Sequence, residues 1–231
     1  MTYPLDGEWL MATDPRNIGR ERQWWSGPTS DARPARVPGI IQEAFPGYHG
    51  VAWYWRSFDA PAHLHPEGRT LLRFGAVDYL AEVWVNDLAV GGHEGGETPF
   101  TLDVTGAVHP GEANRLAVRV VNPTNEPIDG IVLRETPHRN KVIPYRTGSG
   151  YNYGGIIEPV ELQMVPAARV EDLFLRALPK TGVIRAQINM RNASAGTVRG
   201  SLRLSVAAGP TGPVLGRESR PVDLPPGDTM I

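Results

Sequence analysis

The chain has 231 residues, of which 41% are hydrophobic and 21% charged, so it has enough apolar side chains for one large or two modest cores. Its formal net charge of −2 excludes the strongly basic surface that binds nucleic acid or an anionic membrane, and we expect neither partner. It has no cysteine, which excludes disulfides and thiolate metal sites, and its 26 glycines and 22 prolines leave little uninterrupted room for helices.

The N-terminal segment MTYPLDGEWL has no basic region followed by an apolar run. No later stretch approaches the about 18 consecutive apolar residues that a membrane-spanning helix needs. We therefore expect a cytoplasmic protein.

The dominant hydrophobic period is two, which predicts strands with one buried face. In GVAWYWRSF, Val51, Trp53 and Trp55 share one face, and the side chains between them share the other. Asn86-Asp87 lies between two strand-like runs, and its tolerance of positive φ suits a tight hairpin. Short strands separated by turn residues predict a sandwich or barrel.

The tryptophans and their aromatic neighbours are candidates both for core packing and for stacking on the C–H faces of sugar rings. Aromatic side chains in β-sandwiches pack into the core more often than they bind ligand. We assign three of them to the core: Trp9, Trp53 and Trp84. Two positions stay open between core and sugar platform: Trp25 and Tyr54.

Residues 122–150 show only short strand-like runs, around Ile131 and Val142, and carry many charged side chains. A segment of that length with little regular structure is usually functional, disordered or packed against another part of the protein. The alternative is a solvated surface loop whose charges pair locally for little energy.

A second block of strand-like runs begins near Arg169 and includes VEDLFLRAL, VIRAQINM, VRGSLRLSV and VLGRESR. The spacing is typical of an immunoglobulin-like sandwich, which needs about seven strands. We place the domain boundary at Pro166-Ala167-Ala168, giving domains 1–167 and 168–231, and expect the second to be incomplete. It would then expose an open sheet edge that favours pairing with another copy, a homo-oligomer, and leave four apolar side chains uncovered. They are Ile184, Ile188, Leu202 and Leu204.

Seven short blocks resemble, in order and rough spacing, the sugar-binding domain of glycoside hydrolase family 2. The blocks are LDGEW (5–9), VPG (37–39), GVAWYWRSF (50–58), FGAVDY (74–79), VWVND (83–87), HEGGETPF (93–100) and NYGGIIEPVEL (152–162). The resemblance implies an all-β fold, with a jelly-roll, galactose-binding-like β-sandwich followed by a partial immunoglobulin-like β-sandwich. It also implies that residues 122–150 face a catalytic barrel, which favours packing against a partner domain over a solvated loop.

The resemblance implies a retaining β-glycosidase, which needs two carboxylates about 5 to 5.5 Å apart at the glycosidic bond. The family supplies both glutamates from a (β/α)8 barrel, which is absent here, so we assign no catalytic residue and expect the chain alone to be inactive. We expect a β-galactosidase-like parent enzyme whose carbohydrate substrate is shared with that barrel. The alternative is a free-standing carbohydrate-binding or interaction module.

The run from His93 to Glu97 combines an imidazole with two carboxylates and invites a metal or acid–base interpretation. Zinc sites generally need a third protein ligand in a defined geometry. The resemblance implies a structural loop instead, with Phe100 in the core and Asp103 or Thr105 capping local backbone. We expect no metal site and no cofactor.

The best functional candidates precede the GI-x-x-x-V pattern at 155–160, where well-known family members place an aspartate that reaches a sugar hydroxyl. Alignment on Asn152 and Gly155 puts Ser149 at that position, so the contact would lack a charge. We name four substrate-binding candidates: Ser149, Tyr151, Asn152 and Tyr153. The alternative is that Tyr151, Asn152 and Tyr153 only order the chain before the last strand of the sandwich.

Overall fold

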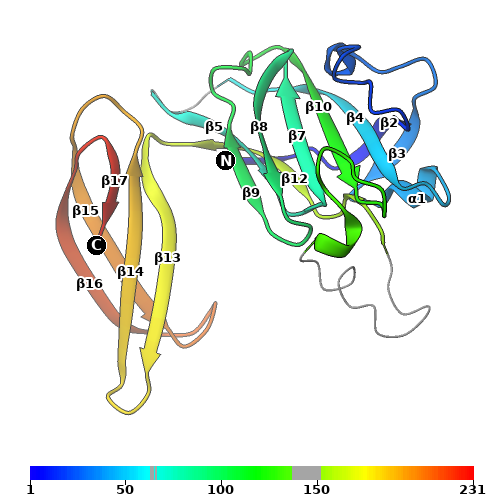
Figure 1. The fold of residues 1–231 in the computed structure, drawn as a ribbon. Coiled ribbons are helices and arrows are strands. Elements are labelled where there is room, and N and C mark those ends of the chain that lie inside the picture. The colour runs from blue at the N-terminus through cyan, green and yellow to red at the C-terminus, as the bar shows by residue number, and fades with distance from the viewer. Residues whose placement is uncertain (63–64, 66, 137–151) are drawn as a thin grey trace. The chain divides into compact units, whose positions relative to one another are not determined.

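The structure is a computed structural model that describes residues 1–62, 65, 67–136 and 152–231 (Figure 1). The chain divides into two compact units, one holding Met1–His63 and Thr70–Met164 and the other Leu64–Arg69 and Val165–Ile231. The described residues are almost entirely strands and connections, which confirms the expected all-β class. No helix in the described ranges is long and apolar enough to cross a lipid bilayer.

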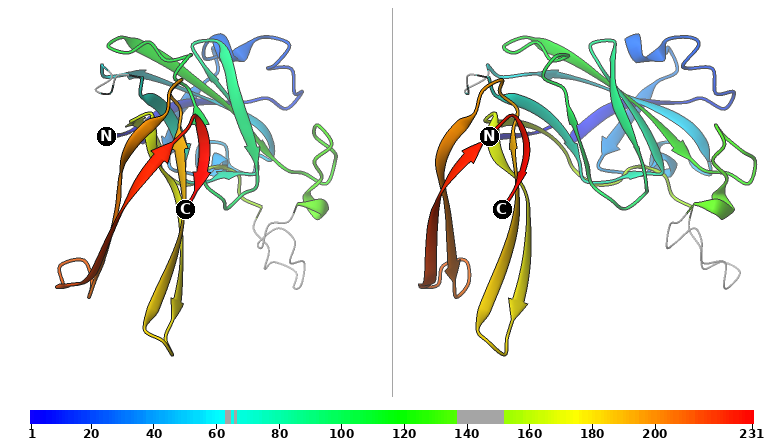
Figure 2. Two further views of the ribbon diagram at one scale, coloured as in Figure 1. Left: turned by 90° about the vertical axis from the view of Figure 1, so that its left-hand side faces the viewer. Right: turned by 60° about the vertical axis from the view of Figure 1, so that its left-hand side comes forward.

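The first unit is built on a six-stranded sheet whose strand order is β3-β2-β4-β10-β7-β8 (Figures 1 and 2). Each neighbouring pair in it is antiparallel. Its strands are β2 (Gly7–Thr13), β3 (Arg33–Val37), β4 (Gly50–Asp59), β7 (Leu80–Val85), β8 (Leu88–Glu94) and β10 (Ala113–Asn122). The two central strands, β4 and β10, are rich in β-branched and aromatic residues, which suit a pleated, buried surface.

A four-stranded sheet of order β1-β12-β5-β9 faces the six-stranded sheet, and a two-stranded sheet pairs β11 with β6. These strands are β1 (Thr2–Pro4), β5 (Arg69–Phe74), β6 (Val77–Asp78), β9 (Phe100–Asp103), β11 (Gly155–Ile156) and β12 (Val160–Val165). The helical segments of the described chain are short: η1 (Trp24–Ser26), α1 (Ile41–Ala44) and η2 (Leu133–Glu135). Parts of the chain that are far apart in sequence thus enclose one core.

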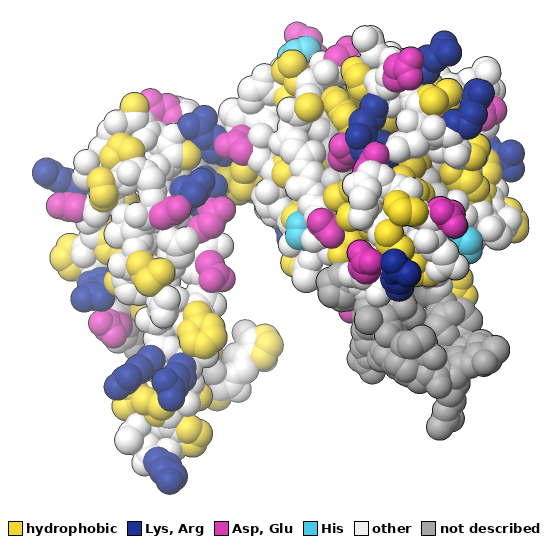
Figure 3. Space-filling view, viewed as in Figure 1, with side chains coloured by type: hydrophobic (Ala, Val, Ile, Leu, Met, Phe, Trp, Pro, Cys, Tyr) yellow, Lys and Arg dark blue, Asp and Glu magenta, His cyan; other side chains and the backbone are white. Residues whose placement is uncertain are grey.

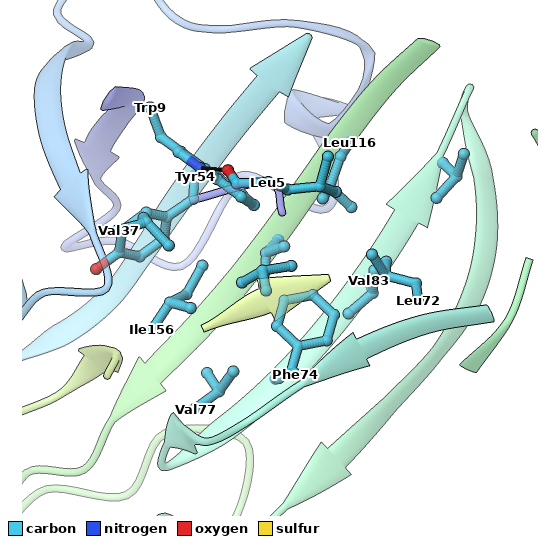
Figure 4. Close-up of a cluster of buried hydrophobic side chains, with 14 of the residues drawn as sticks. Leu5, Trp9, Val37, Tyr54, Leu72, Phe74, Val77, Val83, Leu116 and Ile156 are labelled. Carbon is cyan, nitrogen blue, oxygen red and sulfur yellow. Dashed lines mark hydrogen bonds between the residues drawn. The ribbon is translucent and has the colours of Figure 1, made fainter. Parts of the chain in front are cut away.

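That core lies between the two larger sheets (Figure 4). Trp9 and Tyr54 from one sheet and Leu72 and Phe74 from the other are each no more than 1% exposed. The indole N–H of Trp9 donates to the carbonyl of Leu5 at 2.8 Å, so burial of the ring leaves no polar atom unsatisfied. Burial of each side chain of this size stabilises the fold by roughly 1.5–3 kcal/mol.

Strand β4 is buried on both faces, which corrects the expectation of one buried face. Tyr54 points into the main core, whereas Trp53 and Trp55 belong to a second apolar cluster on the opposite face of the sheet. The segment that contains η1 covers this second face, with Trp24 and Trp25 packed against it. The alternation of side chains along a strand shows which residues share a face. Whether that face is buried depends on which other segments of the chain pack against it.

The hairpin predicted at Asn86-Asp87 is confirmed. β7 and β8 are joined by these two residues, whose φ values are 47° and 70°. Two consecutive positive φ angles are the mark of a type I′ turn, which matches the twist of the strands on either side.

The second unit has two sheets, β13-β14-β17 and β15-β16. Its strands are β13 (Ala168–Leu178), β14 (Val183–Asn192), β15 (Val198–Ala207), β16 (Val214–Leu224) and β17 (Gly227–Met230). Ile188 and Leu202 are only 2% and 8% exposed, because the two sheets pack against each other over a small core. The expectation that these two side chains are uncovered is therefore wrong, whereas Ile184 is 46% exposed. Figure 3 shows further hydrophobic side chains on the surface of this unit, at the left of the view.

Candidate functional site

The part of the predicted sugar-contact segment that the structure describes, Asn152 and Tyr153, leads into β11. It lies beside the residues that lead into α1: the N–H of Ile41 donates to the carbonyl of Gly154 at 2.7 Å, and that of Gly39 donates to Ile156 at 2.8 Å. β11 then pairs with β6. The segment is therefore anchored by backbone hydrogen bonds on two sides.

Two glycines permit this close approach. A Cβ on Gly154 would lie 2.4 Å from the Cβ of Asn122, and a Cβ on Gly155 would lie 2.7 Å from the carbonyl oxygen of Gly39. Gly155 also has a backbone φ of 139°, which residues other than glycine rarely adopt. The Gly-Gly pair of the NYGGI block is thus required by packing and backbone geometry, whatever the segment binds.

A cluster of polar side chains, which we call the amide cluster, surrounds Asn152. It consists of Gln42, His49, Asn122 and Asn152. Asn122 is fully buried; its Oδ1 accepts from Gln42 Nε2 at 3.0 Å and lies 2.9 Å from His49 Nδ1, and its Nδ2 donates to Asn152 Oδ1 at 2.9 Å. Asn152 Nδ2 donates to the carbonyl of Pro123 at 2.7 Å. Buried amides in such a network are stabilised by having their donors and acceptors matched.

Both ends of the Asn152 amide thus bind protein, which indicates that this side chain positions the segment. Its contact with a sugar stays a prediction, as does that of Tyr153, whose side chain is 45% exposed. Ser149 and Tyr151 lie outside the described residues. His49 is exposed and presents its Nε2 edge away from the two amides that its Nδ1 contacts, so it is the member of the cluster best placed to meet a ligand.

A buried arginine holds the neighbouring segment, residues 124–136, against the sheet. The side chain of Arg119 is 0% exposed; its Nη1 donates to Glu82 Oε2, and its Nη2 to Asn17 Oδ1 and Asp129 Oδ2, each at 2.6 Å. Arg20 binds the same two carboxylates. This Arg119 network connects β7, β10, the turn after β2 and the segment after β10.

The network also sets the charge state of Asp129. Partial burial acts to raise the pKa of this carboxyl, but the charge of Arg119 and hydrogen bonds from Asn17 and Arg119 outweigh it, so the pKa lies below its usual value. Asp129 is therefore a fixed negative charge, the opposite of the proton donor that a glycosidase requires.

The loop from His93 to Glu97 is bonded to neighbouring residues of the fold, in keeping with a structural role. The His93 ring stacks on Phe100 with centroids 4.7 Å apart, and its Nε2 lies 2.8 Å from Thr98 Oγ1. Glu94 accepts a hydrogen bond from the hydroxyl of Tyr79 at 3.0 Å. Phe100 packs against the main core, and within the described residues no group of three metal-ligating side chains occurs.

The predicted cap at Asp103 and Thr105 is also present. Asp103 Oδ1 accepts from the N–H of Thr105 at 3.0 Å, and Thr105 Oγ1 accepts from the N–H of Thr70 at 2.9 Å. The cap therefore fixes the end of β9 and ties it to the start of β5.

Five of the six tryptophans form a layer, which we call the tryptophan layer, on the outer face of the six-stranded sheet: Trp24, Trp25, Trp53, Trp55 and Trp84. Trp25 stacks on Trp84 with ring centroids 5.5 Å apart and an interplanar angle of 10°, and Trp53 lies 5.2 Å from Trp84. Trp53 and Trp84 are buried, as is Trp9 in the main core, which confirms their assignment. Tyr54 is 1% exposed and belongs to the core, and Trp25 is partly buried by its stacking partner.

The amide cluster and the Arg119 network were not identified from the sequence. One signal was available: Arg119 and Asn122 interrupt the apolar run LAVRVVN, and a charge on a central strand must be paired if it is buried. The partners of Arg119 lie 37 and 102 residues away at Glu82 and Asn17, which no local pattern reveals.

A family model described as "Glycosyl hydrolases family 2, sugar binding domain" matches residues 40–166, which include α1, β4–β12, the amide cluster and most of the Arg119 network. A β-glucuronidase from Paenibacillus borealis is 32% identical over 182 residues, which are 74% of this chain and 30% of that protein. Human β-glucuronidase is 28% identical over 214 residues, 82% of this chain and 33% of that protein. The chain thus spans about a third of the length of these curated relatives.

Solved structures agree on the fold. A β-glucuronidase from Ruminococcus gnavus in complex with uronic isofagomine matches with a TM-score of 0.69 at 21% identity, over 97% of this chain and 38% of that one. A β-glucuronidase from an uncultured Clostridium matches with a TM-score of 0.68 at 24% identity, over 97% of this chain and 39% of that one. At such identities the likeness shows the fold alone, whereas the family model covers more than half of the sequence. The chain therefore belongs to glycoside hydrolase family 2 and carries the sugar-binding domain of that family.

Proposed function

We propose that this chain is the non-catalytic N-terminal part of a retaining β-glycosidase that acts on β-glucuronides. The observation that carries the proposal is the match of 74% of the chain, at 32% identity, to a bacterial β-glucuronidase. The sequence pattern favoured a β-galactosidase-like enzyme, but the curated relatives reported above are β-glucuronidases. The substrate we infer is therefore a β-linked glucuronic acid conjugate.

In this proposal the carboxylates that cleave the bond come from a catalytic barrel elsewhere in the protein. A retaining enzyme needs a proton donor with a raised pKa next to a carboxylate nucleophile. Two carboxyl groups among the described residues, Asp129 and Asp228, have a pKa that is displaced downward. Asp228 owes this mainly to its hydrogen bond from Arg191, and Asp129 has three arginine and asparagine partners, so both serve as structural anions.

The contribution of the chain is then to shape and support the region around Asn152. The amide cluster fixes the chain where it leaves residues 137–151, and the Arg119 network fixes it where it enters them. Anchors on both sides of a segment hold its ends at a set separation, which is how a scaffold positions residues for a neighbouring active site.

The proposal is tested first on the purified 231-residue chain with aryl β-D-glucuronide and aryl β-D-galactoside. We expect no turnover, because an enzyme accelerates such reactions by about 10⁶-fold or more and the proposal places the catalytic pair outside this chain. Turnover that a substitution within the chain abolishes would place the catalytic groups here and overturn the proposal. Micromolar affinity of the chain for a simple sugar, without turnover, would instead favour a free-standing carbohydrate-binding module.

A further inference from the structure

A cavity of about 370 Å³ lies on the first unit, and His49 is one of its lining residues. Three parts of the chain line it: the turn after β2, the residues just before and at the start of β4, and the segment after β10. Its lining residues are Asp14–Asn17, Tyr48–Val51, Thr124 and Glu126–Asp129. The volume falls within the range of about 300–1,000 Å³ that is typical of small-molecule sites.

The first side of the cavity is held rigidly by Asp14, which is 2% exposed. Its carboxylate accepts from the N–H groups of Ile18 at 2.9 Å and Gly19 at 2.7 Å, and from the indole of Trp53 at 3.2 Å. Its own N–H donates to the carbonyl of Val51 at 2.7 Å, which ties this turn to β4. A site whose walls are fixed before binding loses less entropy when a ligand enters.

The opposite side is held by the Arg119 network through Asp129, and by backbone bonds within the segment. Ile128 and Ile131 exchange hydrogen bonds at 3.0 and 2.9 Å, and Leu133 N–H donates to Thr124 at 2.8 Å. Ile128 also packs on the tryptophan layer. Both sides of the cavity are therefore built on the sheet.

The lining combines an apolar surface with a mixture of hydrogen-bonding groups. Pro15, Pro127 and Ile128 supply accessible C–H and methyl surface. Tyr48 donates its hydroxyl to the carbonyl of Val51 at 2.7 Å, and burial is the main reason that its pKa is raised to about 12, so the ring is neutral. An apolar surface beside convergent polar groups matches a sugar ring, which has C–H faces and hydroxyls at its edge.

Two charged side chains of the lining, Arg16 and Glu126, are exposed and form no ion pair with described residues. Together with His49 they supply hydrogen-bond donors and acceptors to the lining of one cavity, and each sugar hydroxyl both donates and accepts. The four charges of the Arg119 network cancel, since Arg119 and Arg20 offset Glu82 and Asp129. The remaining charges of the lining are those of Asp14, Glu126 and Arg16, which sum to −1.

From this geometry we infer a second carbohydrate site: the cavity binds one neutral saccharide unit and disfavours a uronic acid. The excess of negative charge opposes a carboxylate, whereas the guanidinium, carboxylate and imidazole suit hydroxyls. The site would therefore hold an uncharged sugar of a longer carbohydrate, at a position other than the uronic acid that the proposed function assigns to the enzyme. The inference does not depend on that function, because it concerns the chain by itself.

The test is a titration of the ¹⁵N-labelled 231-residue chain with methyl β-D-glucopyranoside and with methyl β-D-glucuronide, which differ only in the group at C6. We expect amide shifts at Asn17, Gly50 and Thr124 with a Kd on the order of 1 mM for the glucoside. The glucuronide should bind about fivefold more weakly. Repulsion between its carboxylate and one negative charge of the cavity, about 4 Å apart in water, costs about 1 kcal/mol.

Two exposed substitutions probe the cavity itself. Arg16→Ala should weaken glucoside binding about tenfold or more, which is the effect of losing one hydrogen bond to a charged group. Glu126→Gln should narrow the difference between the two sugars. The matched controls are Arg36→Ala and Glu8→Gln, in a hollow of about 420 Å³ lined by Gly7, Glu8 and Pro34–Arg36. These two control substitutions should leave the affinities for the glucoside and for the glucuronide unchanged.

Three results would overturn the inference. They are the absence of shifts at the cavity at about 50 mM glucoside, binding that Arg16→Ala leaves unchanged, and a glucuronide affinity equal to or above that of the glucoside. Amide spectra of each variant without sugar show whether it is folded, so a loss of binding is attributed to the cavity only in a folded variant. The catalytic test of the proposed function uses aryl substrates and turnover, and it can fail or succeed independently.

Discussion

Replacing Arg119 by methionine should destabilise the first unit more than any other single change of a charged side chain in it. Methionine keeps most of the length of the buried stem but removes three hydrogen bonds of 2.6 Å. It also leaves Glu82 and Asp129 with one shared cation, Arg20. The segment that follows β10 would lose its main attachment to the sheet.

The exposure of the partners sets the magnitude. Removing one member of a buried ion pair typically costs about 3–5 kcal/mol, because an uncompensated charge stays buried. Glu82 and Asp129 are 32% and 24% exposed and keep Arg20, so we expect the lower end, about 3 kcal/mol. For a unit of this size that corresponds to a fall in Tm of about 6–12 °C. Arg20→Met is the matched control: Arg20 is 40% exposed, so its loss should cost about 1 kcal/mol or less.

Tryptophan fluorescence during thermal or urea unfolding is the appropriate assay, because all 6 tryptophans lie in the first unit and the second unit is silent. Hydrogen exchange at the amides of Ile128 and Ile131, which bond to each other, adds a local readout. Equal destabilisation by Arg119→Met and Arg20→Met, or unchanged protection of these two amides, would refute the reasoning.

Three further substitutions test other parts of the structure. Gly155→Ala should cost about 2 kcal/mol or more because it adds a close contact to a strained φ, whereas Gly47→Ala, at φ 74° in open space, should cost about 1 kcal/mol; thermal unfolding compares them. Although burial acts to raise the pKa of Asp129, its partners hold it below 3.8, so its stabilisation is complete above pH 3.8 and is lost as the pH falls through the folded value. Asp129→Asn should therefore lower the free energy of unfolding at pH 7. The variant should also lose less of that free energy below pH 4 than the original chain does, which urea unfolding across the pH range measures. Trp25→Ala should cost about 2 kcal/mol by removing the stack on Trp84 yet leave glucoside shifts at the cavity unchanged; lost shifts in a folded variant would show that Trp25 is a sugar platform.

The features that could be predicted from the sequence depend on local geometry. The Asn86-Asp87 hairpin follows from two residues that tolerate positive φ between alternating runs. The strand-like runs after Arg169 became β13–β16, each of which is 10 or 11 residues long and is separated from the next by a short connection. Such signals are contained in the segment that forms the element.

The features that could not be predicted depend on contacts between distant segments. Whether Trp53 and Tyr54 are both buried depends on what covers each face of β4, and that cover comes from η1 on one side and from the other sheet on the other. The contacts of the amide cluster join residues 30 to 103 positions apart. In the sequence, Gln42 and His49 resemble ordinary polar residues of a surface loop. Their role in binding Asn122 follows only from the folded arrangement.

The most direct test of the proposed function is the specificity of the protein in which this chain is joined to a catalytic barrel. The measurement is kcat/KM for 4-nitrophenyl β-D-glucuronide against the matching β-D-galactoside. We expect the glucuronide to be preferred by ~10²-fold or more. A site that binds the carboxylate of the glucuronide has its own partner group for that charge, and this partner is left unpaired when the galactoside binds. A preference for the galactoside, or a polypeptide that ends without a barrel, would contradict the account.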